Sequence, residues 1–443
     1  MMVGLFTNLF FSLTTWSYIL SVFYINKTPE EFCSSYSGNP FNLFGVNRIQ
    51  WPEPKTEVEW PTDCQSICQR SNFQTNDLYP EEAGFPIAIA RAVFMDYHFI
   101  ELDLGAMYSP HNFYCYALDS KSSPLFHQRM RSLANCFPNV FLTDHELPMD
   151  SDGHNMNSAH YQCMLKLADY KWKYLVLLQN HDVPLKTNQE LIQIFKWFNG
   201  TNDVAAAKVD DNRINPKANW TFAAMNLFKN QSRNFLLHHG YPPILPLTKS
   251  MVFVSLSREM VDFLINEINL PNVINNFEWK AYGVDEQLIG SLNAADAVDV
   301  PGGYTRHCYE KGSYSLQITK FMLDFDMFCS HDLKRHYVCV IGLEHLGILQ
   351  HRPELFANKM MPNVDYNAIR CWYEELRRRT HLDRGLHQLH SSVYLNLPHV
   401  RFNRERRSEN FTLTDFTCES NTRIVSWTSW LLFLLCFRVN EVD

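Results

Sequence analysis

The sequence has few charges, and they are not gathered into a run of one sign. Charged residues make up 19% of the 443-residue chain, with 39 Lys and Arg against 47 Asp and Glu and a net charge of −8. Proteins that bind nucleic acid electrostatically present a basic patch. No such patch is visible, so we expect no nucleic-acid partner. Hydrophobic residues make up 46%, enough for one large α/β domain or two medium-sized ones.

Several motifs of common enzyme classes are also absent. The sequence contains no P-loop, G-x-S-x-G elbow, G-x-G-x-x-G turn or H-E-x-x-H helix. Their absence argues against a nucleoside triphosphatase, a serine hydrolase, a Rossmann dehydrogenase and a zinc protease. The twelve cysteines include no C-x-x-C pair, so zinc ligation by cysteine is not expected. In an oxidising compartment these cysteines predict several disulfides instead.

The chain begins with an uncharged apolar segment. Residues 1–24 are long enough to cross a bilayer, which predicts a signal anchor over residues 1–25, with a cleaved signal peptide as the alternative. Both interpretations send the chain into the secretory pathway. Five Asn-x-Ser/Thr sequons agree with that route and predict N-glycosylation at Asn26, Asn199, Asn219, Asn230 and Asn410. The apolar stretch 424–437 stays open between a lipid-dipping tail, a removed anchor signal and a docked strand.

Composition divides the rest of the chain into three parts. Residues 26–82 are rich in Pro, Asn, Ser and Glu and are predicted to be a stem. Residues 83–385 are predicted to be the folded domain, because apolar strand-like runs alternate there with helix-like segments. That alternation predicts an α/β fold with a mostly parallel sheet flanked by helices. Residues 386–443 are predicted to be a C-terminal tail.

Local signals place some of these elements. Thr187 and Glu190 form a capping-box pattern that predicts a helix start, and Ser257 is a predicted N-cap of a later helix. In open α/β sheets, ligands bind beyond the carboxyl ends of the strands. The residues that follow the strand-like segments FYCYAL and YLVLLQ are therefore candidates for a site, and they include Asp119 and Asp182.

A series of ordered blocks resembles the core-2/I-branching β1,6-N-acetylglucosaminyltransferase family, that is, glycosyltransferase family 14, as a divergent member. The blocks are FPIAIARAV, MYSPHNFYCYALDSKS, CFPNVF, WKYLVLLQNHDVPLKTNQE, SMVFVSLSRE, GVDEQLIGSL, VCVIG and LFANK. The likeness runs from about residue 63 to residue 380. It implies a GT-A-like fold, a UDP-sugar donor, and transfer of N-acetylglucosamine in β1,6 linkage to an acceptor that contains galactose or N-acetylgalactosamine.

The resemblance also implies a catalytic base. An inverting transfer is a single in-line displacement and needs a group that takes the proton of the attacking hydroxyl. The family uses the Glu of a Pro-Asp-Glu sequence, and Glu286 of Val284-Asp285-Glu286 matches it. The alternative from the sequence alone is an acid in the first turn of a helix, favoured there by the helix dipole.

The diphosphate of the donor needs a counter-charge. Many GT-A enzymes use a metal held by Asp-x-Asp after a strand, but Asp150-Ser-Asp152 and Asp324-Phe-Asp326 do not follow clear buried strands and are interpreted as solvated loop acids. The resemblance implies instead a Lys and an Arg without metal or other cofactor. Lys359 in LFANK matches the Lys. The Arg position falls on His336, with Arg335 one residue away, and Arg335 is the predicted donor-binding residue.

Further residues follow from the resemblance. Asp119 and Lys121 of ALDSKS match the family's nucleotide-binding block, although an Asp at that place is also a common turn cap. Asp182 lies in the loop that enters the donor site, and Phe321 stands where the family has an acceptor-side Trp. The loop around Asp182 and the residue His154 depart from the family pattern, which puts the acceptor in question more than the reaction.

The family pattern also implies four disulfides: Cys115–Cys163, Cys64–Cys136, Cys329–Cys339 and Cys33–Cys371. Cys68, Cys308, Cys418 and Cys436 stay without an implied partner. The expected protein is thus a single-pass type II membrane protein of the Golgi, with a lumenal catalytic domain, a UDP-sugar donor and a glycan or glycoprotein acceptor. The alternatives are a xylosyl- or glucuronosyltransferase of the same superfamily, a catalytically silent glycan-binding relative, and an extracellular adhesion domain.

Overall fold

The computed structural model describes Cys33 and residues 48–71, 73, 79–238, 240–311, 317–323, 329, 333–383 and 389–419. The apolar segments 1–24 and 424–437, Asn26, Cys436 and Asp324-Phe-Asp326 lie outside these residues. Among the described helices none is long and apolar enough to cross a membrane.

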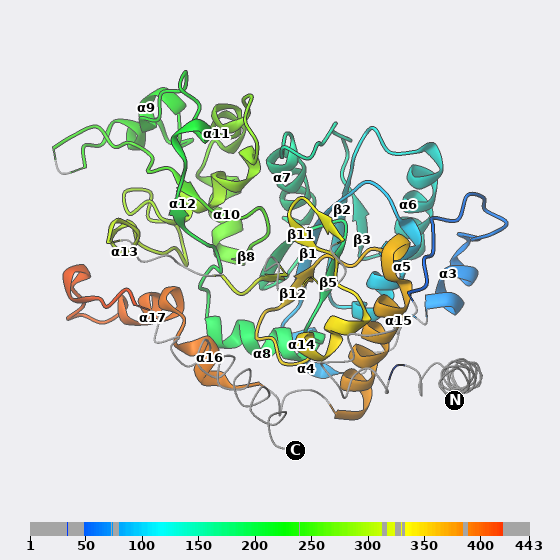
Figure 1. Ribbon diagram of the computed structural model, residues 1–443. Helices are drawn as coiled ribbons and strands as arrows, with labels where there is room; N and C mark the ends of the chain where they lie inside the picture. The colour runs from blue at the N-terminus through cyan, green and yellow to red at the C-terminus, as the bar shows by residue number, and fades with distance from the viewer. Residues whose placement is uncertain are drawn as a thin grey trace, which may run out of the picture.

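A five-stranded sheet forms the centre of the molecule, with the strand order β3-β2-β1-β4-β8 (Figure 1). Four strands are parallel and β8 pairs antiparallel with β4. The strands are β1 (Ile87–Val93), β2 (Phe113–Leu118), β3 (Val140–Leu142), β4 (Tyr174–Gln179) and β8 (Ser255–Ser257). The predicted α/β fold with a mostly parallel sheet is therefore confirmed.

Three smaller sheets extend this body. One has the order β5-β12-β9, with β5 (Asp182–Pro184), β12 (Phe356–Asn358) and β9 (Lys320–Met322). The others pair β6 (Ala207–Lys208) with β7 (Thr248–Lys249), and β10 (Lys334–Arg335) with β11 (Val338–Cys339).

Strand β1 explains why helices cover both faces of the sheet. All seven of its residues are buried, as expected for a parallel strand that is covered on both sides. Alternate side chains point to opposite faces: Ile87, Ile89 and Val93 join one core, while Ala88, Ala90 and Ala92 join the other. The sheet thus separates two apolar cores.

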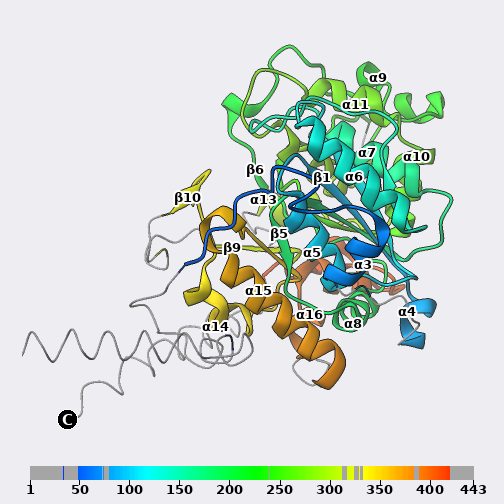
Figure 2. The same cartoon turned by 90° about the vertical axis from the view of Figure 1, so that its right-hand side faces the viewer.

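The first core is covered by helices from both ends of the chain, several of which are prominent in Figure 2. They are α3 (Cys64–Ser71), α5 (Tyr97–Met107), α6 (Pro124–Cys136), α8 (Asn188–Phe198), α14 (Leu346–Leu349), α15 (Pro362–Arg378) and α16 (Ser391–Leu395), and the short helix α4 (Pro80–Gly84) packs on α8. The second core is covered by α7 (Met156–Leu167), α9 (Phe222–Met225), α10 (Arg258–Asn266), α11 (Leu270–Phe277) and α12 (Leu288–Asn293). Further helices are α13 (Arg306–Glu310) and α17 (Pro398–Glu405).

The predicted helix starts are confirmed. Thr187 and Glu190 form a complete capping box at α8, and the hydroxyl of Ser257 accepts a hydrogen bond from the backbone N–H of Met260 at α10. Helical turns of other kinds are η1 (Asp211–Arg213), η2 (Gln231–Phe235), η3 (Val284–Glu286), η5 (Leu343–His345), η6 (Arg379–Asp383) and η8 (Leu413–Asp415).

The folded body is larger than the sequence indicates at both ends. Part of the predicted stem packs on it: Trp60 is buried, and the backbone N–H of Trp51 donates to the carbonyl of Pro362 over 2.8 Å. At the other end, α16 and α17 continue past residue 385, and a small core around Phe402 contains a disulfide between Cys308 and Cys418. These two cysteines, which the sequence left unpaired, join the C-terminal segment to α13.

The other four disulfides join the pairs that the resemblance implies, Cys33–Cys371, Cys64–Cys136, Cys115–Cys163 and Cys329–Cys339. Among the described cysteines, Cys68 is free. The sequon residues Asn199, Asn219, Asn230 and Asn410 are all exposed, as a glycan would require.

Candidate functional site

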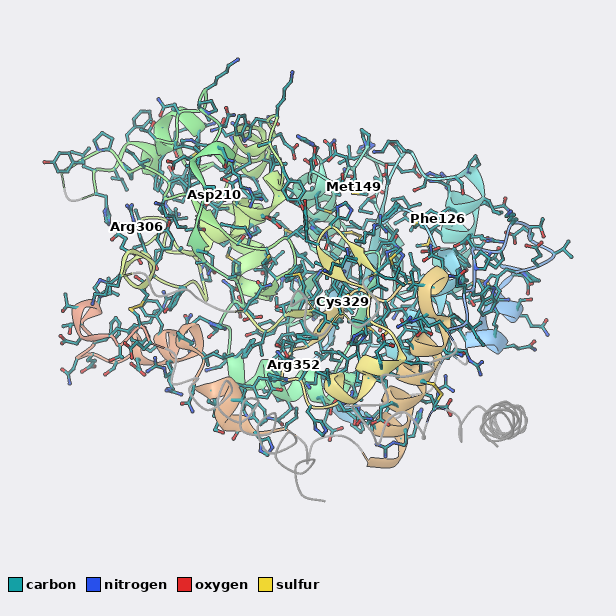
Figure 3. The ribbon with its side chains drawn as sticks, viewed as in Figure 1. Phe126, Met149, Asp210, Arg306, Cys329 and Arg352 are labelled. Atoms are coloured by element: carbon teal, nitrogen blue, oxygen red, sulfur yellow. A yellow bond between two sulfur atoms is a disulfide. The ribbon has the colours of Figure 1, made fainter. Side chains whose placement is uncertain are left out.

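The carboxyl end of β2 carries the first predicted residue, Asp119. Its carboxylate accepts a hydrogen bond of 2.9 Å from the backbone N–H of Lys121, so Asp119 caps the turn that follows the strand. The Lys121 ammonium lies 3.8 Å from the other Asp119 oxygen and donates to the carbonyl of Met149, which Figure 3 labels. Asp119 therefore performs the turn-capping role and still leaves one oxygen beside a largely exposed lysine.

Asp182, at the start of β5, lies in the interior. Its carboxylate forms an ion pair with Lys320 at 2.9 Å, and both side chains are 0% exposed. The same carboxylate accepts hydrogen bonds from the backbone N–H of Gln179 and the side-chain amide of Asn358, each at 2.7 Å. Asp182 thus holds three segments together from a fully buried position, and its contact with the donor stays a prediction.

Asn358 immediately precedes Lys359, so this buried network places the predicted cation at the end of β12. The Lys359 ammonium donates to the carbonyl of Arg335 over 3.0 Å. Burial lowers the pKa of Lys359 to about 8, and the nearby positive charges of Arg335 and Lys320 act in the same direction. A buried cation next to other cations is a site that favours an anionic ligand.

The hairpin of β10 and β11 decides between Arg335 and His336. His336 and Tyr337 form its turn, both with positive φ, and both are exposed. The Arg335 guanidinium instead lies 5.4 Å from the ring centroid of Phe94, just past the carboxyl end of β1. Arg335, not His336, thus points toward the sheet edge where ligands bind.

Glu286 lies in the turn η3, between two cations that the sequence did not reveal. Its carboxylate accepts from the Arg213 guanidinium at 2.5 Å and lies 3.6 Å from the Lys249 ammonium. The Glu286 side chain is 23% exposed, so it remains accessible to a ligand. Arg213 and Lys249 lie near the two ends of one long segment, residues 208–249. Both ends of this segment reach the same carboxylate.

Two glycines allow the close packing of this turn. Gly283 has a φ of +69°, and a Cβ there would lie 1.6 Å from the Arg213 guanidinium. Gly153 has a φ of +92°, and a Cβ there would lie 2.1 Å from a carboxylate oxygen of Asp285. Asp285 is buried, and its pKa is raised to about 7 by burial and then by the neighbouring charge of Glu286. Asp285 is therefore partly protonated near neutral pH.

Electrostatic contacts connect the acidic turn to the cations of β10 and β12. Burial lowers the pKa of Lys320 and the charges of Asp182 and Asp285 oppose that shift, while the charge of Lys320 helps to lower the pKa of Lys359. The pKa of His336 is lowered by burial and then by Lys359 and Arg335, while Asp152 opposes this shift. The carbonyl of Asp152 in turn accepts from the backbone N–H of Gly283 over 2.7 Å. One region therefore holds a partly exposed carboxylate and a pair of cations.

The Asp150-Ser-Asp152 loop is held by its own hydrogen bonds. The Asp150 carboxylate accepts from the backbone N–H groups of Asp152 and His154 and lies 2.9 Å from the His154 imidazole. The other imidazole nitrogen of His154 lies 2.8 Å from the carbonyl of Trp279. His154 thus anchors this loop to the segment before η3, and Asp150 works as a loop acid.

Phe321 packs against Cys329 and Cys339, the disulfide pair beside the β10–β11 hairpin. The neighbouring Lys320 points to Asp182, so Phe321 points to the opposite face of β9. There its ring lies 4.3 Å from the guanidinium carbon of Arg352, which Figure 3 labels below Cys329. The structure therefore gives Phe321 a packing contact, and its contact with the acceptor stays a prediction.

Sequence reasoning missed Arg213, Lys249, Lys320 and Phe94. Arg213 lies in a polar loop without periodicity, 73 residues before its partner Glu286. Lys320 carries a more readable signal, because it begins a short apolar strand and a buried lysine needs a carboxylate partner. Nothing in the sequence indicates that this partner is Asp182.

The family model and the most similar curated relatives agree on one family. The model of the family described as "Branch: Core-2/I-Branching enzyme" matches residues 87–349. A Bos taurus beta-1,3-galactosyl-O-glycosyl-glycoprotein beta-1,6-N-acetylglucosaminyltransferase is 29% identical over 334 residues, with 72% of this chain and 75% of the relative covered. A Homo sapiens N-acetyllactosaminide beta-1,6-N-acetylglucosaminyl-transferase is 28% identical over 352 residues, with 76% and 82% covered.

Among solved structures, the mannosyltransferase Ktr4p from S. cerevisiae in complex with GDP aligns at 14% identity with a TM-score of 0.26, covering 62% of this chain and 77% of that one. The family match spans both the sheet and the turn that carries Glu286, as well as the β10–β11 hairpin. The chain therefore belongs to the core-2/I-branching family of glycosyltransferases.

Proposed function

We propose that this protein is an inverting, metal-independent transferase that moves N-acetylglucosamine from UDP-N-acetylglucosamine in β1,6 linkage onto a glycan that contains galactose or N-acetylgalactosamine. The names of the relatives support the sugar and the linkage. The observation that carries the mechanism is the position of Glu286, a partly exposed carboxylate in the same region as the buried cation Lys359 and the half-buried cation Arg335.

Glu286 acts as the general base in this proposal. The acceptor hydroxyl donates its proton to a Glu286 oxygen while the hydroxyl oxygen attacks the anomeric carbon from the side opposite the diphosphate. The new C–O bond forms as the bond to the diphosphate breaks, which inverts the anomeric centre. Arg213 and Lys249 hold the carboxylate in place through ion pairs, so it need not reorganise when the acceptor arrives.

Lys359 and Arg335 supply the counter-charge for the leaving diphosphate. Fixed cations at a buried position stabilise charge that develops on the leaving group, which is the task that a divalent metal performs elsewhere. The Asp182–Lys320 pair acts as a positioning group, because Asp182 also holds Asn358, the residue before Lys359. Asp119 and Lys121 at the end of β2 are proposed to contact the nucleotide, with the Asp119 oxygen that faces Lys121 as acceptor.

The compartment follows from the same proposal. An anchor over residues 1–25 would hold the enzyme in the Golgi membrane as a single-pass type II protein with its catalytic domain in the lumen. The five disulfides and the exposed sequon residues support an oxidising, glycosylating compartment.

The test is a transfer assay with the purified full-length chain, UDP-N-acetylglucosamine and a Galβ1,3GalNAc acceptor. We expect a branched product whose β1,6 linkage is verified by NMR, and a rate that added Mn²⁺ does not raise. Transfer only from UDP-xylose or UDP-glucuronic acid would contradict the proposed donor. UDP binding without transfer from any of these donors would favour the silent glycan-binding alternative.

A further inference from the structure

Tyr282 places an exposed aromatic ring beside the proposed base and is not used in the mechanism above. It precedes the turn that carries Glu286, and it is 54% exposed. Its hydroxyl forms no hydrogen bond with the residues that the structure describes, and its ring stacks on none of their aromatic rings. A large aromatic side chain contributes to stability by burying its ring. An exposed ring contributes little in that way, so its free face is available to a ligand.

The backbone around Tyr282 is held on two sides. Its carbonyl accepts a hydrogen bond from Nε of Arg213 over 3.0 Å, and the carbonyl of Gly283 accepts from the same guanidinium over 2.9 Å. The backbone N–H of Gly283 donates to the carbonyl of Asp152 over 2.7 Å. A tyrosine on a fixed backbone has only two free side-chain torsions, so little entropy is lost when a ligand packs on its ring. The ring is therefore preorganised for a contact although it is exposed.

Arg213 connects the ring to the carboxylate of Glu286. Arg213 ends the turn η1, which follows Asp210, labelled in Figure 3. The guanidinium carbon lies 5.8 Å from the centroid of the Tyr282 ring, and the same guanidinium donates to Glu286 over 2.5 Å. Burial raises the pKa of Tyr282 and the negative charge of Glu286 acts in the same direction, which agrees with a ring close to the carboxylate. A group that packs on the free part of this ring therefore lies beside the proposed base.

A galactose-type sugar has a shape that suits such a surface. Its axial 4-hydroxyl projects from one face of the pyranose, and the C–H groups of carbons 3, 4 and 5 form an apolar patch on the opposite face. These C–H groups pack favourably on the electron-rich face of an aromatic ring. Carbon 6 lies at the margin of the patch, so a galactose-type sugar that packs on Tyr282 presents its 6-hydroxyl at the edge of the ring. A glucose-type sugar has an equatorial 4-hydroxyl and lacks this one-sided patch.

We propose that Tyr282 is an acceptor-binding residue that selects galactose-type sugars, because its ring packs on the apolar face of the sugar whose 6-hydroxyl is directed to Glu286. This inference rests on the proposed function, since it assigns one sugar of the acceptor to the same site. It adds the residue that recognises the configuration at carbon 4, and it leaves the donor contacts of Lys359 and Arg335 unchanged. Binding of the acceptor can be measured without transfer, so the two proposals can fail separately.

The experiment measures acceptor binding and acceptor kinetics with the full-length chain. The two probes are Galβ1,3GalNAc and Glcβ1,3GlcNAc, in which both sugars have an equatorial 4-hydroxyl. Binding is followed by saturation-transfer NMR with UDP present and no donor sugar, and initial rates are measured with saturating UDP-N-acetylglucosamine and varied acceptor. The variants are Tyr282→Ala and Tyr282→Leu, which remove the ring, and Tyr282→Phe, which keeps it. The matched control is Tyr241→Ala, because Tyr241 is 76% exposed and lies outside the site, in the loop before β7.

We expect Tyr282→Ala and Tyr282→Leu to raise the acceptor KM and the Kd for Galβ1,3GalNAc by about fivefold to tenfold, the size of one aromatic contact. Their donor KM should not change and their kcat should stay within about threefold of the wild type. Tyr282→Phe and Tyr241→Ala should bind like the wild type. Saturation should reach the protons of carbons 3, 4 and 5 of one galactose-type sugar most strongly, and the preference for Galβ1,3GalNAc over Glcβ1,3GlcNAc should disappear with the ring.

An unchanged acceptor Kd in Tyr282→Ala and Tyr282→Leu overturns the proposal. A fall in kcat at an unchanged acceptor KM also overturns it, because the ring would then act only by supporting Arg213. A wild-type chain that binds Galβ1,3GalNAc without transfer contradicts the proposed function, and the NMR comparison still decides the role of Tyr282. If one of the two ring-less variants fails to fold, by circular dichroism, the other variant and the saturation pattern of the wild type decide.

Discussion

Replacing Glu286 with Gln should abolish most of the transfer while leaving the protein folded and able to bind UDP. Gln has nearly the same volume, and its amide oxygen can still accept the 2.5 Å hydrogen bond from Arg213. The substitution removes only the ability to take a proton. A positioned general base contributes a factor of about 10² to 10⁴, so kcat should fall by that factor, which corresponds to about 3–5 kcal/mol in the barrier.

The charge change predicts a second result. In Glu286→Gln the cations Arg213 and Lys249 lose a negative neighbour, so the positive potential over the site rises. UDP affinity, measured by calorimetry, should therefore be unchanged or slightly tighter, and the loss should appear in kcat and not in the donor KM. The matched control is Glu278→Gln, another half-buried carboxylate of the same segment, which accepts from the backbone N–H of Asn155. Its kcat should stay within about threefold of the wild type.

A Glu286→Gln enzyme with near-normal kcat would refute the assignment of the base. A variant that loses UDP binding and transfer together would instead mean that Glu286 supports the donor site, and that the argument from its exposure is wrong.

Three further predictions follow from the geometry. The folded-state pKa of Lys359 is about 8, so its positive charge is present below that pH and is lost above it. The Kd for UDP, measured by calorimetric titration, should therefore rise toward tenfold per pH unit above pH 8. The Lys359→Met variant should bind UDP weakly, with a Kd that does not change with pH. Gly283→Ala should displace Arg213, since a Cβ would lie 1.6 Å from the guanidinium, and should lower both kcat and the free energy of unfolding. The control is Gly240→Ala, at a glycine with a φ of +83° and no atom within 4 Å of its Cβ position. It should lower the free energy of unfolding in urea by only about 1 kcal/mol and leave kcat unchanged. Equal kinetics for the two glycine variants would contradict the account of the turn. Asp182→Asn leaves a buried ammonium unpaired and should lower the free energy of unfolding in urea by about 3–5 kcal/mol; a loss under 1 kcal/mol would show that the pair is not buried in solution.

Features that depend on neighbouring residues could be predicted from the sequence. The capping box at Thr187 and the N-cap at Ser257 are local hydrogen-bond patterns, and both are present. The alternation of strand and helix patterns gave the parallel sheet, because a strand such as IAIARAV can be buried throughout only when helices cover both faces.

Long-range contacts could not be predicted in the same way. The sequence marks Asp182 as a residue after a strand, which is a position typical of ligand contacts, but its partner Lys320 is 138 residues away and satisfies it internally. Likewise, no spacing rule connects Cys308 to Cys418 across 110 residues. The family resemblance predicted Glu286 and Lys359 as site residues. Arg213 was identified only from its contact with Glu286 in the structure.

The measurement that tests the central claim most directly is product formation by the full-length chain with UDP-N-acetylglucosamine and a Galβ1,3GalNAc acceptor, run in parallel with EDTA added at the start and with Mn²⁺ added. The account predicts the same initial rate of β1,6-branched product in both, because Lys359 and Arg335 carry the counter-charge for the diphosphate. An immediate loss of product in EDTA that Mn²⁺ restores would contradict it and would assign the diphosphate to a metal site.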